Sequence, residues 1–459
     1  MEKTINKIVK FTEYIANGKD FRKSEALDVL NLISDSNRNL NVYRGILAVY
    51  YFSRFNRFPG RSLEKLKTDE NFLKCLSFLK GDLLLPPPEV GGVFLNILKI
   101  PDSNGEYRDI LMGCFYGALW SFMNNPENFE KATEYGIAII KSAFSLDNFN
   151  VQQKINLNKD KVKVISLGGS GKKEIKLLNI SSIAAIITAA TVKEIGEDIV
   201  VEKTVSRATS SITGSSDIFE LVGVNLNLPI DKMADISLKT RLGIFDINSI
   251  VPQLNHVYDG RLYDVQVFAG LVGGAAIVNP VNANLINYGL TRGSTKLCLA
   301  ILNRLYPGKN ILVLQGKDPI GTPVIDQISI SANTEIAQCI GNQIMIKEIT
   351  PKDFGFDFKP FKYIEMTQDP RENLNEFIKI LIGHGSEELK QTVAMEVALN
   401  LYGLEIVKSL KIGAQLALET INAGKGIKIL KDLIIHSGGD IEKFNKILEE
   451  LDFAKNYEF

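Results

Sequence analysis

The segment Lys203–Asp217 combines two cations with a dense group of hydroxyls, directly before the apolar helical run Ile218–Val222. Hydroxyls and backbone amides can surround a phosphate while Lys203 and Arg207 neutralise its charge. The positive end of the following helix adds to the same field. We interpret this segment as an anion-binding loop. The alternative is a surface loop whose hydroxyls only cap the helix.

A second candidate loop, Ser166–Gly171, contains three glycines between a strand pattern and a long apolar helix, Ile180–Val192. Glycine lets backbone N–H groups approach an anion closely, and the helix that follows presents its positive end. A glycine-rich turn that serves only tight packing between strand and helix is the alternative. Both loops could therefore hold phosphate groups.

Elements of an α/β domain must position these loops. A helical pattern at 295–305 separates strand-like runs, which lie at 161–165, 198–201, 310–314 and 324–330. This alternation predicts a mainly parallel central sheet with helices on both sides. Residues 1–150 instead show apolar positions three and four apart, and 386–451 return to that pattern, so we expect an all-helical amino-terminal domain and a helical carboxyl terminus.

Composition excludes several classes of protein. The chain has 459 residues, with 53 Lys and Arg against 53 Asp and Glu, so its net charge is zero and nucleic-acid binding is disfavoured. The longest apolar run is too short to cross a membrane. The charged amino terminus lacks the apolar centre of a secretory signal, and four scattered cysteines form no zinc or disulfide pattern. We expect a cytoplasmic protein.

The two loops together resemble those of the anthranilate phosphoribosyltransferase family, whose superfamily also contains the pyrimidine nucleoside phosphorylases. The family pattern Gly-Thr-Gly-Gly-Asp, followed by Asn-x-Ser, is similar to residues 166–170 and 179–181. Its Lys-His-Gly-Asn-Arg-x-x-Ser-Ser-x-x-Gly-Ser-x-Asp is similar to residues 203–217. The family's Leu-Asn-Pro, Asp-Glu-Ile-Ser and Thr-Pro-Glu-Asp-Phe-Gly resemble residues 278–280, 326–329 and 350–355. The chain is identified as a divergent member.

The resemblance implies a phosphoribosyltransferase, which moves ribose 5-phosphate from phosphoribosyl pyrophosphate, or another phosphorylated ribose, to a nitrogen acceptor with the help of Mg²⁺. The catalytic residues that it implies are Lys203 and Arg207. The implied substrate-binding residues are Gly168, Gly169, Ser170, Gly171, Asn179, Ser206, Ser210, Ser211, Ser215 and Arg261. The implied metal-binding residues are Ser181, Asp326 and Gln327.

Departures from the family pattern fall on these positions. Ser170 replaces an Asp and Gln327 replaces a Glu, so two negative charges are lost and Mg²⁺ binding should be weak. Thr204 and Ser206 replace the His and Asn that shape the anthranilate pocket, and Arg261 lies one position from the arginine that holds the anthranilate carboxylate. We therefore expect an aromatic or heterocyclic acceptor other than anthranilate.

Two further functions remain open. A nucleoside phosphorylase needs no metal, which would account for the lost carboxylates, and residues 259–263 are similar to the phosphorylases' Lys-Lys-Leu-Tyr segment. However, Gln266 stands where those enzymes have an arginine. A non-catalytic relative that binds nucleotide, nucleic acid or a partner protein is also compatible with the lost charges.

For domain organisation we expect an extra helical module at 1–75, a family-type helical domain at 76–155 and the phosphoribosyl-binding α/β domain at 156–459. A weak similarity between 18–65 and 81–131 suggests that the helical part is duplicated, with chance similarity as the alternative. The family dimerises through its helical domain, and the apolar residues Tyr50, Tyr51, Phe52 and Phe55 favour a homodimer here. If the duplication is real, the first copy could instead cover that surface within one chain. The prolines at 86–88 predict an extended linker.

Overall fold

The computed structural model describes residues 2–32, 40–58, 61–82, 84–157, 162–170, 175–208, 212–258 and 274–451. The chain forms two compact units. One consists of Met1–Asn150 with Gln253–Val272, and the other of Val151–Pro252 with Gly273–Phe459. The expected helical amino-terminal region and α/β region are confirmed. The expected limit between residues 75 and 76 falls inside a helix, and the finer division of the helical region stays a prediction.

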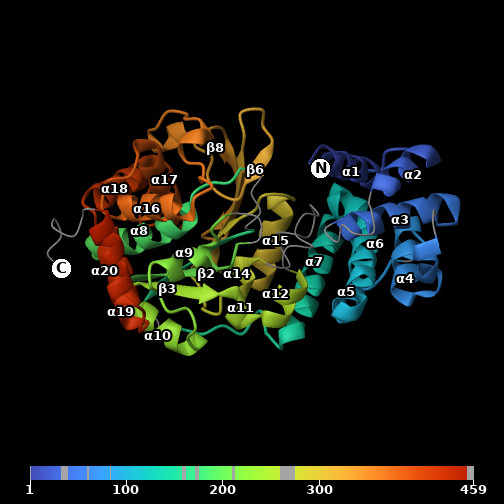
Figure 1. The fold of residues 1–459 in the computed structure, drawn as a ribbon, viewed down its shortest axis with the longest axis horizontal. Helices are drawn as coiled ribbons and strands as arrows, with labels where there is room; N and C mark the ends of the chain where they lie inside the picture. The colour runs from blue at the N-terminus through green and yellow to red at the C-terminus, as the bar shows by residue number, and fades with distance from the viewer. Residues whose placement is uncertain are drawn as a thin grey trace. The chain divides into compact units, whose positions relative to one another are not determined.

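Helix α6 forms the centre of the first unit, and α1, α3, α4, α5 and α7 pack against it (Figure 1). Every residue from 108 to 120 on this helix is buried, because α1, α3, α4, α5 and α7 all contact it. The α-helices that the structure describes in this unit are α1 (Glu2–Ala16), α2 (Lys23–Leu32), α3 (Asn41–Phe55), α4 (Glu70–Lys80), α5 (Pro87–Leu98), α6 (Gly105–Asn124), α7 (Phe129–Phe144) and most of α12 (Pro252–Tyr258).

Glycines allow α3 and α6 to pack with their backbones almost in contact. A Cβ atom on Gly45 would lie 1.9 Å from Ile110 O, and a Cβ atom on Gly113 would lie 1.9 Å from Val42 O. No other residue type fits at either position. The part of the chain before residue 80 therefore covers one face of α6 within the same molecule.

The aromatic residues of α3 do not form the exposed patch expected from the sequence. Tyr51 and Phe52 are buried, and the Tyr50 hydroxyl donates a hydrogen bond to Gly117 O over 3.0 Å. Phe55 packs its ring against Tyr51 at a centroid separation of 4.7 Å. This expectation was wrong because the apolar face of α3 is used inside the chain. The homodimer stays a prediction that needs another surface.

The proline-rich segment is not wholly extended, as the sequence suggested. Pro86 is extended, but α5 begins at Pro87. Proline is tolerated in the first turn of a helix because the N–H that it lacks has no partner there. The prolines thus start a helix rather than continue a linker.

The second unit contains one mixed sheet with the strand order β3-β2-β1-β4-β5-β7-β8, and β6 pairs with β5 beside this path. Strands β3, β2, β1, β4 and β5 are parallel, whereas β6 and β7 are antiparallel to β5 and β8 is antiparallel to β7. The strands are β1 (Lys163–Gly169), β2 (Ile199–Val205), β3 (Leu242–Asp246), β4 (Leu285–Gly289), β5 (Asn310–Lys317), β6 (Pro323–Ile325), β7 (Thr334–Ile340) and β8 (Gln343–Ile349). The mainly parallel sheet is confirmed, but the strand expected at 324–330 ends at Ile325.

Helices cover both faces of this sheet (Figure 1). Helices α8 and α17 pack on the face that carries Lys203 and Asn287, and α10 and α14 pack on the face that carries Ser166 and Glu202. The described residues of this unit form the α-helices α8 (Ile180–Glu194), α9 (Ser215–Leu221), α10 (Ile230–Thr240), α11 (Ile247–Ile250), α14 (Ala275–Val278), α15 (Thr295–Leu305), α16 (Pro370–Leu381), α17 (Glu387–Gly403), α18 (Leu410–Asn422), α19 (Gly426–His436) and α20 (Ile441–Glu450). Among the described helices, none combines the length and the apolar character needed to cross a membrane.

Candidate active site at the carboxyl ends of the parallel strands

Strands β1 and β4 mark the place where the order of the sheet reverses. From β1 the chain continues to β2 and β3 on one side, whereas β4 leads to β5 on the other. Loops that leave such neighbouring strands in opposite directions open a crevice at their carboxyl ends, where ligands bind in α/β sheets. Gly169 and Gly289 lie opposite each other at this point. The glycine loop predicted from the sequence therefore stands at the expected crevice.

These two glycines allow the segment after β6 to approach the sheet. A Cβ atom on Gly169 would lie 2.4 Å from Asp326 Oδ2, and one on Gly289 would lie 1.8 Å from Asp326 O. A side chain at either position would expel Asp326 from the crevice. The glycines at the strand ends are thus required by the position of a buried carboxylate.

A small cavity of about 30 Å³ brings together residues from six separate stretches of the chain. Its volume is close to the space that one water molecule or ion occupies. The residues that line it are Leu167, Gly168, Gly169, Ser181, Ala184, Asn287, Gly289, Leu314, Asp326, Gln327, Glu396 and Asn400. Five of the residues implied by the sequence therefore meet at one place, namely Gly168, Gly169, Ser181, Asp326 and Gln327.

Ser170 connects the ends of β1 and β4. Its N–H donates to Gly289 O over 2.9 Å, and its hydroxyl oxygen accepts the N–H of Thr291 over 3.1 Å. The two hydroxyls of Ser170 and Thr291 are 2.9 Å apart. Ser170 thus holds the two sides of the crevice together. Gly171, the next residue of the predicted loop, lies outside the described residues.

Lys203 and Asn179 link the two predicted loops. Lys203 is 3% exposed, and its Nζ donates to Ser181 Oγ, in the first turn of α8, over 3.1 Å. Asn179, just before that helix, donates from Nδ2 to Thr213 O over 3.4 Å. The ammonium group is therefore held inside the protein beside a residue that lines the cavity.

The second loop is closed by its own hydrogen bonds. Ser206 N–H donates to Ser215 Oγ over 3.1 Å, and Asp217 Oδ2 accepts the N–H groups of Ala208 and Gly214 over 3.0 and 2.8 Å. These contacts use Ser215 and Asp217 to fold the loop onto the first turn of α9. Ser210 and Ser211 lie outside the described residues, as does Arg261.

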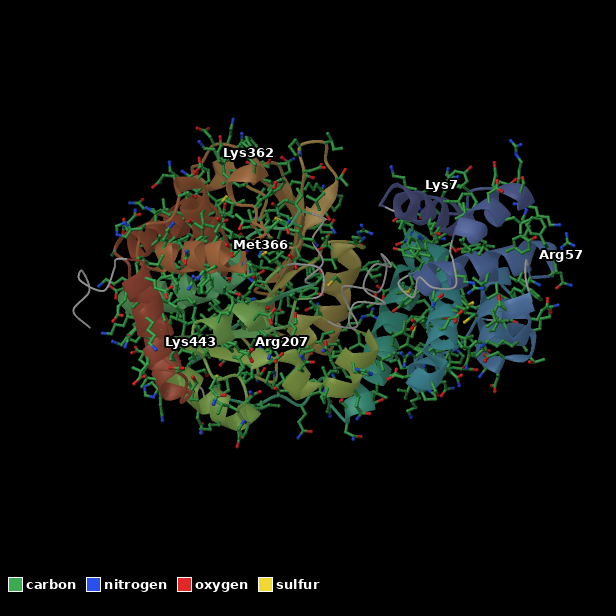
Figure 2. All side chains as sticks on the ribbon, viewed as in Figure 1. Lys7, Arg57, Arg207, Lys362, Met366 and Lys443 are labelled. Carbon is green, nitrogen blue, oxygen red and sulfur yellow. The ribbon has the colours of Figure 1, made fainter. Side chains whose placement is uncertain are left out.

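Arg207, labelled in Figure 2, forms an ion-pair group with two carboxylates. Its guanidinium binds both oxygens of Glu220, with Nη2 2.6 Å from Oε1, and Nη1 lies 3.2 Å from Asp217 Oδ1. The hydrogen bonds to Glu220 raise the pKa of Arg207 further above its ordinary value. Two carboxylates therefore already balance its charge, and the predicted catalytic role stays a prediction.

Glu396 is a residue of this site that the sequence interpretation missed. It lies on α17, is 6% exposed, and accepts the N–H of Ile328 at Oε1 over 2.7 Å. The apolar spacing over 386–451 predicts a helix here but no site, and the only local signal is an acid between Met395 and Val397. An acidic residue within such an apolar stretch indicates a buried carboxylate that has a functional or structural role.

The oxygens of the cavity fit a hard divalent cation in part. Asp326 and Glu396 supply carboxylates, and Gln327 supplies an amide whose Oε1 has no hydrogen-bond partner in the part of the chain that the structure describes. Mg²⁺ is commonly held by one or two carboxylates together with phosphate oxygens of the substrate. Among the described residues, no group of three or more His, Cys, Asp and Glu side chains could hold a metal ion. A cation here would therefore need further oxygens from a ligand.

Comparison with known proteins gives the family. Residues 158–427 match the model of the glycosyl transferase family, a/b domain, and the chain belongs to this family. Anthranilate phosphoribosyltransferase from Francisella tularensis subsp. tularensis is 27% identical over 289 residues, which are 63% of this chain and 80% of the relative. The same enzyme from Persephonella marina is 26% identical over 282 residues, which are 61% and 79% of the two chains. The resemblance to the anthranilate phosphoribosyltransferase family is thus confirmed.

Solved structures share the fold. Anthranilate phosphoribosyltransferase from Thermus thermophilus aligns with a TM-score of 0.59 at 20% identity, covering 79% of this chain and 99% of the other. The enzyme from Saccharomyces cerevisiae, in complex with PRPP and Mg, aligns with a TM-score of 0.60 at 17% identity, covering 80% and 98%. The helical region followed by an α/β region is therefore the architecture of these enzymes.

Proposed function

We propose that the protein transfers ribose 5-phosphate from phosphoribosyl pyrophosphate to an aromatic or heterocyclic nitrogen acceptor other than anthranilate. The observation that carries this proposal is the cavity where Gly168 and Gly169 meet Ser181, Asp326 and Gln327. These residues come from distant parts of the chain, and the family resemblance assigned all of them to the diphosphate, the ribose or the metal. Their convergence at the crevice of a parallel sheet supports a phosphorylated ligand at this place.

The chain's own groups would act mainly by positioning and charge. Gly168 and Gly169 would bring backbone N–H groups to the diphosphate, and the ammonium of Lys203, which donates to Ser181 Oγ, would add positive charge beside the same cavity. Asp326 and Gln327 would hold Mg²⁺, which would neutralise charge on the diphosphate that leaves the ribose. Preorganised charge of this kind lowers the barrier for a leaving group that carries developing negative charge.

The acceptor is inferred from the positions that differ from the family pattern. Thr204 is 4% exposed on β2, and the backbone N–H of Ser206 is used to close its own loop. Neither residue offers the imidazole or amide that the resemblance assigns to anthranilate binding. An acceptor other than anthranilate agrees better with these residues.

Isothermal calorimetry with phosphoribosyl pyrophosphate, with and without Mg²⁺, tests the proposal. We expect saturable binding that Mg²⁺ strengthens, and a loss of affinity of about tenfold or more when Lys203→Gln removes the buried ammonium. Lys232→Gln, an exposed lysine on α10, is the matched control and should bind as the parent does. Binding that ignores Mg²⁺ and Lys203 would contradict the proposal. Binding of inorganic phosphate with a nucleoside, without metal, would favour a nucleoside phosphorylase instead.

A further inference from the structure

Glu396 and Asp326 place two carboxylates in one cavity at the end of the sheet. Both residues are 6% exposed, and both line the cavity of about 30 Å³. Their elements are unrelated in sequence, since Asp326 follows β6 and Glu396 lies in the middle of α17. Two acidic groups that share so small a space repel each other unless positive charge lies between or beside them.

Gln327 gives an independent sign of a ligand in the same cavity. It is 2% exposed, and its side-chain carbonyl oxygen accepts no hydrogen bond from any residue that the structure describes. A buried amide oxygen without a donor costs free energy, on the order of 1–3 kcal/mol. A bound cation with its water would satisfy this oxygen.

We propose that Glu396 supplies the second carboxylate of a divalent cation site, in place of the negative charge that is missing at Gln327. The cation would be held by Asp326, Glu396 and the amide oxygen of Gln327, with further oxygens from a bound diphosphate. This inference rests on the proposed function, because the diphosphate is its expected co-ligand. It assigns to α17 a role in ligand binding rather than packing alone.

The hydrogen bond that Glu396 accepts allows the effect of its negative charge to be tested separately from its structural role. Its Oε1 accepts the N–H of Ile328 over 2.7 Å, which fixes the segment that carries Asp326 and Gln327 against α17. Glutamine at position 396 keeps an oxygen that can accept this bond and removes only the negative charge. The variant Glu396→Gln therefore separates the anchoring role from the charge.

Binding of Mn²⁺, measured by electron paramagnetic resonance and calorimetry with and without inorganic pyrophosphate, tests the proposal. We expect the parent to bind Mn²⁺ in the presence of pyrophosphate, and Glu396→Gln to weaken this binding about tenfold or more. Glu388→Gln makes the same exchange on the same helix but outside the cavity, and should bind Mn²⁺ as the parent does. Glu396→Gln combined with Gln327→Glu returns one carboxylate to the cavity and should regain most of the lost affinity.

Unchanged Mn²⁺ affinity in Glu396→Gln, or no Mn²⁺ binding by the parent with pyrophosphate, would overturn the inference. If circular dichroism shows that Glu396→Gln does not fold, crystals of the parent soaked with Mn²⁺ and pyrophosphate provide the test instead. Anomalous scattering must then place Mn²⁺ at coordination distance from a Glu396 oxygen, and a peak elsewhere contradicts the inference. These readouts need no phosphoribosyl pyrophosphate. Mn²⁺ binding that depends on Glu396, without affinity for phosphoribosyl pyrophosphate, would reject the proposed function and keep the metal site.

Discussion

Ser170 and Gln327 occupy positions where the family pattern has carboxylates, but the structure uses them differently. Ser170 joins β1 to β4 through its hydrogen bonds with Gly289 and Thr291, whereas Gln327 lines the cavity and its buried amide oxygen has no hydrogen-bond partner among the described residues. At position 170 the serine that replaces the acid therefore has a structural role. At position 327 the glutamine keeps a side-chain oxygen, but this neutral oxygen attracts a cation less strongly than a carboxylate does.

Restoring both acids should strengthen the response to Mg²⁺. We expect Ser170→Asp with Gln327→Glu to increase the Mg²⁺-dependent affinity for phosphoribosyl pyrophosphate by more than the sum of the two single effects, because both groups would act on one ion. Calorimetry of the four proteins measures this coupling. A double variant that folds normally by circular dichroism but binds no better than the parent would show that the pocket has lost this chemistry.

Glu202 is a buried acid on the other face of the sheet. It is 0% exposed, and a Cβ atom on Gly243 would lie 2.0 Å from its Oε2. Burial raises its pKa to about 8. The neutral form is therefore the one that the fold accepts.

The stability of the protein should consequently fall as pH rises from the ordinary carboxyl range to about 8. In this window the unfolded chain releases the proton of Glu202 and the folded chain keeps it, so each pH unit costs up to about 1.4 kcal/mol. Glu202→Gln cannot ionise and should gain stability over the parent as pH increases, measured by urea unfolding at pH 5, 7 and 9. Glu197→Gln, an exposed acid, is the control. A difference between Glu202→Gln and the parent that is the same at all three pH values contradicts the burial of a neutral acid.

The pairing of α3 with α6 depends on backbone contact at glycine. Gly113→Ala would place its Cβ 1.9 Å from Val42 O, so we expect a loss of roughly 1–3 kcal/mol in the free energy of unfolding. Gly92→Ala on α5 meets no atom within 4 Å and should instead stabilise the protein by up to about 1 kcal/mol. Fluorescence of Trp120, the only tryptophan in the sequence, follows the unfolding of this unit. Equal stability of the two variants would mean that the helices have room to separate.

Elements with strong local signals could be predicted from the sequence, and those fixed by distant contacts could not. The helix Thr295–Leu305 was predicted at its observed bounds, because its apolar positions recur regularly and Ser294 caps it by accepting the N–H of Leu297. The hairpin of β7 and β8 was missed although its turn, Gly341-Asn342, has positive φ at both residues. Glycine followed by asparagine between strand-like runs is a typical hairpin signal. The convergence of Asp326 and Glu396 has no local signal, since it arises only when α17 packs on the sheet.

In the molecule as a whole, residues 1–80 form part of the core of the helical unit. Trp120 Nε1 donates to Asn17 Oδ1 over 3.1 Å, and Tyr50 donates to Gly117 O, so the first helices make specific contacts with α6. Removal of residues 1–80 should expose the apolar face of α6 and cause self-association of the shortened chain. Size-exclusion chromatography with light scattering measures this outcome. A shortened chain that stays monomeric and as stable as the parent would show that the first helices are dispensable.

The homodimer stays a prediction. Tyr51 and Phe52 are buried within one chain and do not support it, so it rests only on what the family resemblance implies. Light scattering of the full chain should give twice the mass of 50.9 kDa if the dimer forms. The mass of a single chain at all working concentrations would remove the dimer and favour coverage of that surface by the first helices.

We propose that a phosphorylated ribose binds at the carboxyl ends of β1 and β4, between the two glycine- and hydroxyl-rich loops. Crystals of the full chain grown with phosphoribosyl pyrophosphate and Mg²⁺ test it most directly. We expect diphosphate density against Gly168 and Gly169, with Lys203 Nζ within hydrogen-bond distance of a phosphate oxygen and the metal beside Asp326. Density for the ligand at any other place, or an empty crevice at a saturating concentration of the ligand, would contradict it.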